Sequence, residues 1–220
     1  EDEPGALNES FSDIMATAAE WAIDEPVSTN CRSDAGQVGC PDWWIGEDVI
    51  FDDALGYAFR NMSDPALMSQ PSHYADYYPD PFDLDNGGVH VNSGIPNKAF
   101  FLVAFALDGF AWEKAGKIWY RALVDARLPN NTDFQRFATM TARIANELYG
   151  STVRNTVVAA WHEVGIGGDA LHLDRSGAFN APKAVGAPSG VVFASLGVTN
   201  IVYRDGQGRH VGPRSDQRRL

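Results

Sequence analysis

Three carboxylates lie along one side of the first predicted helix. Asp13 and Glu20 follow Glu9 by 4 and 11 residues, and at about 100° per residue these separations put the three side chains on one stripe. The stripe is either an ordinary solvated face or a face that cations neutralise. A rise of about 1.5 Å per residue puts Glu9 and Glu20 about 16 Å apart, enough for two separate metal ions. Apolar side chains occupy the opposite side: Phe11, Ile14, Ala18 and Trp21.

A histidine follows a carboxylate across a Gly-Gly turn. Asp85 precedes His90 by five residues, with Gly87 and Gly88 between them. This spacing lets Asp85 accept a hydrogen bond from one ring nitrogen of a protonated His90 while the other nitrogen points outward as a donor. A positioned imidazole of this kind can stabilise the oxyanion that forms when a carbonyl becomes tetrahedral. A structural or surface Asp–His pair is the alternative.

The two cysteines, Cys31 and Cys40, could also react with each other. They lie in a stretch rich in Ser, Asn, Asp and Gly that is typical of a surface loop. We expect a small loop-closing disulfide formed in an oxidising compartment. The alternative is a pair of unrelated loop thiols.

Helices must position most of these residues. Apolar side chains recur at helical spacing in the C-terminal half, and breakers separate the segments. Residues 24–42 are expected to form the cysteine loop, and residues 43–85, rich in Pro, Asp, Tyr and Gly, to be ordered but mostly irregular with short helices. Gly150 is expected to be the C-cap of one helix and Ser151 the N-cap of the next. The fold class is therefore mainly α, a helical bundle with long ordered loops, and its predicted helices are residues 4–23, 97–107, 112–126, 133–149 and 152–164.

Composition changes after residue 165. Gly, Pro, Ala and Ser dominate to about residue 190, a β-like run covers residues 191–203, and the end is basic. We expect one domain over residues 1–165. Residues 166–220 are expected to be a linker followed by the start of an appended β module, or a partly disordered extension.

The overall charge limits the classes of molecule that the protein is expected to bind. Asp and Glu number 29 against 17 Lys and Arg, for a formal charge of -12. Nucleic acid and anionic lipid both select basic surfaces, so we expect neither as a partner. The longest purely apolar run, residues 99–107, is far shorter than the roughly 20 residues that span a bilayer.

Six ordered motifs resemble the thermolysin family of secreted zinc metallopeptidases. GALNESFSDI at residues 5–14 is similar to the family's GAxNExxSD helix, and WWIGED at 43–48 to its WxIGED segment. RNMSDP at 60–65 resembles its RxMSDP turn, and residues 85–99 match DNGGVHxNSGIxNKA almost without gaps. GKIWYRAL at 116–123 and LYGST at 148–152 continue the series. The resemblance covers residues 5–165 and implies the C-terminal helical half of such an enzyme.

The resemblance assigns roles at the zinc end of the first helix. It implies that Glu9 is the glutamate ligand of a His₂Glu zinc site, and that Asp13 and Asn8 support the ligands from outside. His90 is implied as the histidine that stabilises the tetrahedral intermediate, with Asp85 as its partner. Arg60 corresponds to the arginine that binds the substrate carbonyl just after the scissile bond.

The resemblance also implies a substrate pocket and a calcium site. Ile45, Val49 and Phe59 fall at positions lining the pocket for a hydrophobic residue after the cut, and the family archetype has Leu where this chain has Phe59. Carboxylates of the calcium site correspond to Glu20, Asp42 and Glu47. Trp44 stands where the archetype has a second bridging glutamate, so one calcium ion is expected rather than two.

No HExxH sequence, which supplies two zinc histidines and the general base in this family, occurs in the 220 residues. Only eight residues precede Glu9, so we expect a processing or truncation boundary at Glu1 and a missing N-terminal half that acts with this one on a peptide or protein substrate. The chain alone is expected to be inactive. A non-catalytic metal-binding or complementing module is the alternative. A metal-independent hydrolase based on Asp85 and His90 is disfavoured because no nucleophile is indicated beside them.

Overall fold

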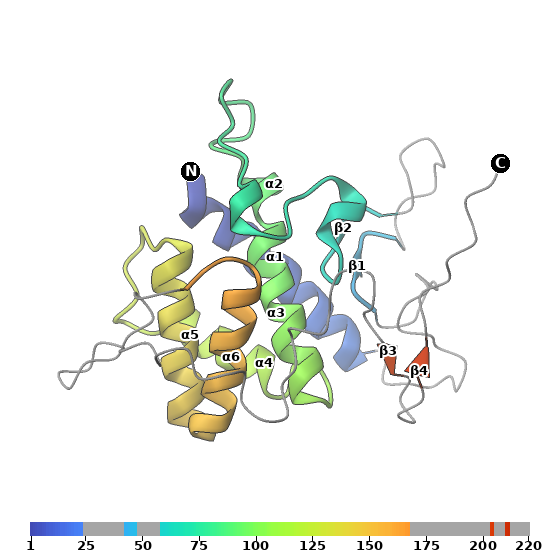
Figure 1. Ribbon diagram of the computed structural model, residues 1–220, viewed down its shortest axis with the longest axis vertical. Helices are drawn as coiled ribbons and strands as arrows, with labels where there is room; N and C mark the ends of the chain where they lie inside the picture. Colours follow the sequence, from blue (N-terminus) through green and yellow to red (C-terminus); the bar gives the residue numbers. More distant parts are fainter. Residues whose placement is uncertain (24–41, 48–57, 168–202, 205–209, 212–220) are drawn as a thin grey trace.

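The structure, a computed structural model, describes residues 1–23, 42–47 and 58–167 and the backbone of two short strands near the C-terminal end (Figure 1). Helices form most of the described part, which confirms the mainly α fold class. Cys31, Cys40 and Val49 lie outside the described residues, and so does the predicted run at 191–203 except for Tyr203.

Helix α1 (Asp2–Ile23) begins two residues earlier than predicted. Pro4 lies in its first turn, where a missing N–H costs the helix nothing. Just before it, the Glu3 carboxylate accepts hydrogen bonds from the Tyr74 hydroxyl (2.7 Å) and from the backbone N–H of Phe134 (2.7 Å). The bond to Glu3, together with burial, raises the pKa of Tyr74 to about 12. The start of α1 is thereby tied to the start of a distant helix.

Helices α2 (Val89–Asn92) and α3 (Gly94–Leu107) follow one another with a break at Ser93. The predicted start at residue 97 is wrong by three residues. Pro96 has no N–H to donate to the preceding turn, which explains why the helix is interrupted here rather than continuous. Among the described residues, no helix is both long and apolar enough to cross a membrane.

Helix α4 (Ala115–Leu123) is shorter than the predicted range 112–126. Residues before it form a turn in which the N–H of Gly116 bonds the carbonyl of Ala111 (2.8 Å). Beyond its end, the Asp125 carboxylate accepts the N–H of Arg127 (2.9 Å), and this local side-chain bond competes with helix continuation. The hydrophobic spacing extends past both ends, so periodicity alone overestimated the helix.

Helices α5 (Phe134–Tyr149) and α6 (Ser151–Glu163) form an antiparallel pair joined by a single residue. Gly150 has φ of +82°, a conformation that a side chain disfavours, and it ends α5 as predicted. The same glycine occupies the cap position of α6, so Ser151 is the first helical residue rather than the cap. At the other end of α5, the Asp133 carboxylate accepts the N–H of Arg136 (2.7 Å) and caps the helix.

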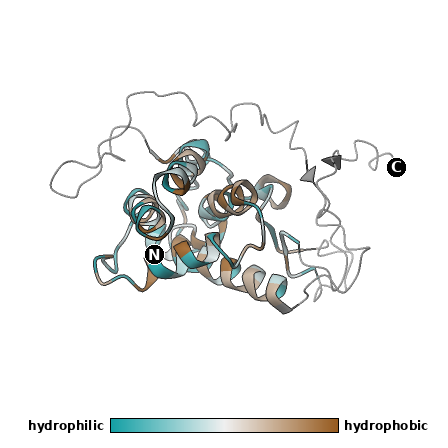
Figure 2. Cartoon of the chain, turned by 90° about the horizontal axis from the view of Figure 1, so that it is seen from below, coloured by the Kyte–Doolittle hydropathy of each residue, from teal (hydrophilic) through white to brown (hydrophobic). Residues whose placement is uncertain are grey.

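The core lies between these helices and α1. Trp119 is fully buried; its ring stacks on Trp161 at 6.1 Å and meets the edges of Phe100 at 5.3 Å and Phe137 at 6.3 Å. Figure 2 shows hydrophobic segments gathered where the helices meet and hydrophilic segments toward the outside. Burial of these aromatic side chains is the main term that holds the bundle together.

Short elements complete the described structure. Strand β1 (Trp44–Ile45) pairs antiparallel with β2 (Arg60–Asn61), an element that the sequence did not predict. The 3-10 helices η2 (Pro65–Met68) and η3 (Tyr74–Asp76) are the short helices expected in this region. Strand β3 (Tyr203–Arg204) pairs antiparallel with β4 (His210–Val211). The division after residue 165 stays a prediction.

Replacing Trp119 by Ala is expected to lower the free energy of unfolding by about 3–5 kcal/mol, because the cavity left between the helices cannot close completely. Urea unfolding followed by circular dichroism measures the change. Tyr120→Ala is the matched control, since Tyr120 is 53% exposed, and it should change the same quantity by less than about 0.5 kcal/mol. Equal losses for the two variants would contradict the assigned core.

Candidate active site and cation site

His90 stands at the exposed end of α2 with a carboxylate on each side of its ring. Its Nδ1 donates to Asp85 Oδ1 at 2.5 Å, the bond that the spacing predicts. The second oxygen of Asp85 accepts the N–H groups of His90 (2.9 Å) and Val91 (3.3 Å). Three bonds to two consecutive residues therefore set the direction in which the imidazole points.

Glu9 approaches the other side of the same imidazole. Its Oε2 lies 3.3 Å from His90 Nε2, and the two side chains are 29% and 57% exposed. Glu9 comes from α1 and His90 from α2, two helices that pack against each other. A carboxylate and an imidazole nitrogen thus share one accessible position on the surface, where each can reach an added ion or substrate.

Asp13, one helical turn after Glu9, is in a very different environment. Its side chain is 3% exposed and forms a bidentate ion pair with Arg60. Nε and Nη2 of Arg60 each donate to one oxygen of the Asp13 carboxylate at a distance of 2.7 Å. Asn97 Nδ2 on α3 donates a third bond to the same carboxylate at 2.8 Å. A buried carboxylate needs such compensation, and the three donors join α1, β2 and α3.

The turn after Arg60 is held by its own side chains and by one lysine. Asn61 Oδ1 accepts the hydroxyl of Ser63 (2.7 Å) and the N–H of Asp64 (2.7 Å). Lys98 Nζ donates to the carbonyl of Ser63 and lies 5.0 Å above the ring centre of Phe101. Burial lowers the pKa of the Lys98 ammonium, although Asp64 and Glu163 act in the opposite direction. Lys98 therefore anchors the turn that presents Arg60.

Two buried amides fix the backbone around α2. Gln70 Nε2 donates to the carbonyl of His90 at 2.6 Å. Asn92 exchanges two bonds of 2.8 Å with the backbone of Tyr78. Gly88 has φ of +76°, and a Cβ there would lie 2.7 Å from Asn92 Nδ2, so only glycine fits this approach. The catalytic candidate His90 is thus supported by several neighbours.

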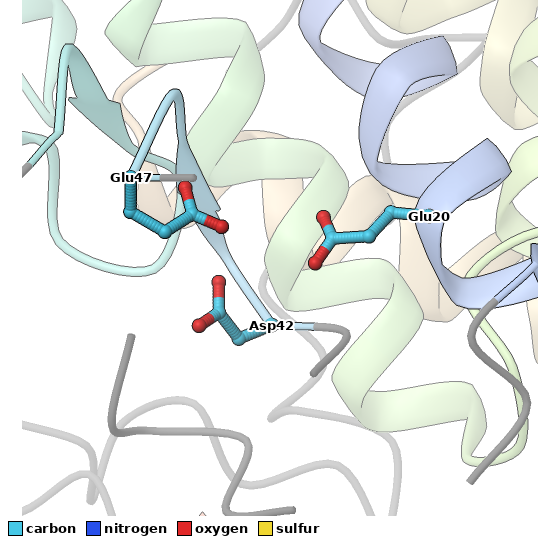
Figure 3. A group of neighbouring side chains, drawn as sticks. All are labelled: Glu20, Asp42 and Glu47. Carbon is cyan, nitrogen blue, oxygen red and sulfur yellow. The ribbon is translucent and has the colours of Figure 1, made fainter. Parts of the chain in front are cut away.

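A second group of carboxylates gathers at the other end of α1. Glu20 extends from α1, Asp42 precedes β1 and Glu47 follows it, and each offers an oxygen within 4.8 Å of the others. Figure 3 shows the three side chains converging on one point from these separate segments. Asp42 is buried and accepts the N–H of Trp44 at 2.7 Å. Three like charges this close repel one another unless a cation lies among them, and oxygen ligands suit calcium.

Two of the three predicted pocket residues lie at the β1–β2 pair, Ile45 within β1 and Phe59 directly before β2. The N–H of Phe59 donates to the carbonyl of Ile45 at 2.8 Å. Phe59 is 56% exposed, and its ring lies across Gly46, where a Cβ would meet a ring carbon at 2.2 Å. Ile45 and Phe59 are therefore adjacent, on the strand pair that carries Arg60. Val49 is outside the described residues.

Comparison with known proteins assigns the family. Residues 1–166 match the family model described as the alpha-helical domain of thermolysin metallopeptidase. This chain belongs to the thermolysin family. Protease PrtS of Photorhabdus sp. (strain Az29) is 38% identical over 171 residues, which cover 74% of this chain and 43% of the relative. The extracellular metalloprotease of Pectobacterium carotovorum subsp. carotovorum is 40% identical over 172 residues, covering 74% and 46%.

A solved structure of another metalloproteinase is similar as well. The precursor of protealysin, a metalloproteinase from Serratia proteamaculans, is similar with a TM-score of 0.61 at 39% sequence identity. The match covers 76% of this chain and 51% of that one. This thermolysin-family chain therefore spans about half, or less, of the length of these relatives.

Most of the site residues predicted from the sequence occupy two groups in this thermolysin-family domain. Glu9, Asp85 and His90 meet at one end of α1, with Asp13 and Arg60 alongside, and the cation candidates meet at the other. Asn8 is exposed on α1. The carboxylate stripe is not an ordinary solvated face, because its middle member is buried in an ion pair.

Several supporting residues were missed. Asn92 and Asn97 lie inside the motif at residues 85–99, but the resemblance assigns them no role. Gln70 and Asp80 have no recognisable motif, although Asp80 belongs to a conspicuous Tyr/Asp/Pro stretch. Only the contacts in the folded structure reveal which groups these side chains bond.

Replacing Arg60 by Lys is expected to lower the free energy of unfolding by about 1.5–3 kcal/mol, because an ammonium cannot reproduce the bidentate bond to buried Asp13. Urea unfolding measures this loss. Arg143→Lys, in an exposed pair with Glu147, is the control and should cost less than about 1 kcal/mol. In a double-mutant cycle with Asp13→Asn, additive effects would show that the two residues do not act as a pair.

Proposed function

We propose that this chain forms the C-terminal half of the active site of a secreted zinc metalloendopeptidase that cleaves peptide bonds on the N-terminal side of hydrophobic residues. The observation that carries the proposal is the meeting of Glu9, His90 and Asp85 at one accessible position, with Arg60 on the neighbouring strand. The family supports the reaction class, and the relative described as an extracellular metalloprotease supports the location.

Glu9 is the zinc ligand that this chain contributes. An accessible carboxylate suits zinc, but a catalytic zinc site of this kind takes three protein ligands, so one carboxylate does not hold the ion firmly. The two histidines and the general base would come from an HExxH helix on polypeptide outside the 220 residues. Bound zinc supplies Lewis acidity and lowers the pKa of a coordinated water molecule. Without those partners, the chain is expected to show no peptidase activity.

His90 stabilises negative charge on the reacting carbonyl oxygen. Both ring nitrogens donate only in the imidazolium form; in that form Nδ1–H bonds Asp85 and Nε2–H donates at the position that Glu9 also reaches. A donor fixed before the reaction needs no rearrangement as the charge develops, and loss of one such donor typically reduces kcat about 10²–10³-fold.

Arg60 binds the substrate backbone. Its guanidinium carries five N–H donors, and the bonds to Asp13 use Nε and Nη2. The ion pair holds the planar group in one orientation, so the remaining N–H groups can donate to the carbonyl that follows the scissile bond. The ion pair with Asp13 thus orients a substrate-binding group.

Ile45, Val49 and Phe59 would line the pocket for the residue after the cut. Two of them are adjacent in the described structure, and Phe59 is 56% exposed. An aromatic ring fills more of such a pocket than the leucine of the family archetype. We therefore infer a pocket of different depth that still accepts hydrophobic side chains.

The cluster of Glu20, Asp42 and Glu47 would bind one calcium ion. Three carboxylates from α1 and from both sides of β1 offer hard oxygen ligands, and carbonyl groups or water can complete the coordination. The ion would join the C-terminal part of α1 to the β1–β2 pair, which carries Arg60 and the pocket residues. Its role is to stabilise this arrangement.

The zinc proposal is tested by joining this chain to the part of the Pectobacterium extracellular metalloprotease that it does not match. If that part supplies the two histidines and the base, the joined protein should hold about one zinc ion and cleave peptides before hydrophobic residues, and a chelator should abolish cleavage. His90→Ala should reduce kcat about 10²–10³-fold with zinc retained, whereas Glu9→Gln should lose zinc.

The control for this experiment is Glu113→Gln, whose carboxylate accepts the N–H of Phe110 at 3.2 Å; it should match the parent. Cleavage by Glu9→Gln at the parental rate would overturn the ligand assignment. Zinc binding with no cleavage by the parent would favour the alternative of a non-catalytic metal-binding or complementing module.

The calcium proposal predicts a cation-dependent melting temperature for the 220-residue chain. Calcium at about 100 times its Kd should add about 2.7 kcal/mol to the free energy of unfolding. Glu47→Gln should remove most of this gain because a ligand charge is lost, and Glu113→Gln should keep it. Differential scanning calorimetry with and without calcium measures the shift, and an equal shift in the Glu47 variant would place the ion elsewhere.

A further inference from the structure

The loop that leads into α2 carries a buried carboxylate among exposed neighbours. Asp80 is 5% exposed, whereas Phe82 and Leu84 in the same loop are 76% and 83% exposed. In Figure 1 this loop projects beyond the helices, and α2 with His90 follows directly from it. A carboxylate withdrawn from water in a protruding loop needs a local reason.

The reason is a set of backbone donors from the next seven residues. Asp80 Oδ2 accepts the N–H groups of Asp85 (2.7 Å) and Gly87 (3.2 Å), and Oδ1 accepts that of Leu84 (3.1 Å). Desolvation opposes ionisation, but these N–H groups outweigh it and hold the pKa of the Asp80 carboxyl below its usual range. Asp80 therefore acts as an ionised hub for the loop.

The loop backbone is strained enough to require such a hub. Asp80, Asp83 and Asn86 have φ of +40°, +50° and +49°, in the region that residues with side chains rarely adopt. No strand ladder passes through these described residues. Bonds from one side chain to several N–H groups replace the regular hydrogen bonding that would otherwise fix the chain.

The bond to the N–H of Asp85 links this hub to His90. Asp85 directs both of its oxygens at His90 and Val91, including the 2.5 Å bond to Nδ1. Those bonds define the imidazole direction only if the backbone of Asp85 is itself fixed. Asp80 makes the shortest of its own bonds, 2.7 Å, to that backbone.

We propose that Asp80 is a positioning residue for His90: it holds the backbone of residues 84–87, so that the Asp85 carboxylate stays against Nδ1 and Nε2 stays directed at the reacting carbonyl. The catalytic part of this inference rests on the function proposed above. The geometric part concerns this chain alone and can be tested without activity.

The variants are chosen for the backbone that Asp80 adopts. Asn and Gly both tolerate positive φ, so Asp80→Asn and Asp80→Gly change the side chain without adding backbone strain. Asn keeps one acceptor oxygen and Gly keeps none, so the effects should increase in that order. Asp83→Asn is the matched control, because Asp83 also has positive φ and lies in the same loop with an exposed side chain.

The first readout is the proton NMR signal of His90 Nδ1–H in the 220-residue chain at one fixed pH. The parent and Asp83→Asn should show a downfield, slowly exchanging signal that Asp85→Asn weakens. Asp80→Asn should broaden it, and Asp80→Gly should remove it. An unchanged signal in both Asp80 variants would overturn the proposal.

The second readout is kinetic, in the joined peptidase described above. Asp80→Asn should reduce kcat about tenfold, a typical effect of residues that support a catalytic group, with KM within about twofold of the parent. The double variant of Asp80→Asn and Asp85→Asn should be no slower than Asp85→Asn alone, because both changes act on the same imidazole. Additive losses would overturn the proposal.

The two readouts separate the two proposals. If the parent peptidase is inactive but the Nδ1–H signal depends on Asp80, the positioning role stands and the proposed function fails. If peptidase activity is normal in both Asp80 variants, the positioning role fails and the function stands. Melting temperatures exclude general unfolding, and a variant that melts cooperatively with the parental signal and rate counts against the proposal.

Discussion

The bidentate pair between Asp13 and Arg60 is the interaction on which the arrangement of the site depends. It connects residues 47 positions apart, and Asn97 adds a contact from 84 positions away. Burial makes it costly to break, since a lone carboxylate would remain inside the protein. The pair therefore fixes how β2 lies against α1. That one relation places the substrate-binding candidate Arg60 next to the helix that carries the metal-binding candidates.

Local sequence signals explain the parts of the fold that were predicted well. Gly150 ends α5 because a helix end favours the positive φ that glycine adopts readily, and the spacing of Asp85 and His90 is short enough for the turn to set their contact. Boundaries failed where tertiary or side-chain bonds overrode periodicity. The turn before Ala115 and the Asp125–Arg127 bond shorten α4, and α3 begins before the predicted start because Pro96 is tolerated in the first turn of a helix.

The residues of the candidate site also divide into those that sequence signals predicted and those that only the folded structure reveals. Residue types and motifs identified Glu9, His90, Arg60 and their partners because those residues carry recognisable chemistry at recognisable spacing. Gln70 and Asp80 could not be found in this way. Their side chains bond backbone groups, and any residue type supplies a backbone N–H or carbonyl, so the sequence holds no pattern for such contacts.

Helix α1 is a rigid connection between the two proposed cation positions. Eleven residues of helix separate Glu9 from Glu20, about 16 Å at 1.5 Å per residue. Exposed charges that far apart are largely screened at physiological salt, where the Debye length is about 8 Å. An ion at the Glu20 end therefore cannot tune the Glu9 end through its electric field. Its influence would be mechanical. By fixing the Glu20 end of α1, the ion would restrict the movement of the Glu9 end.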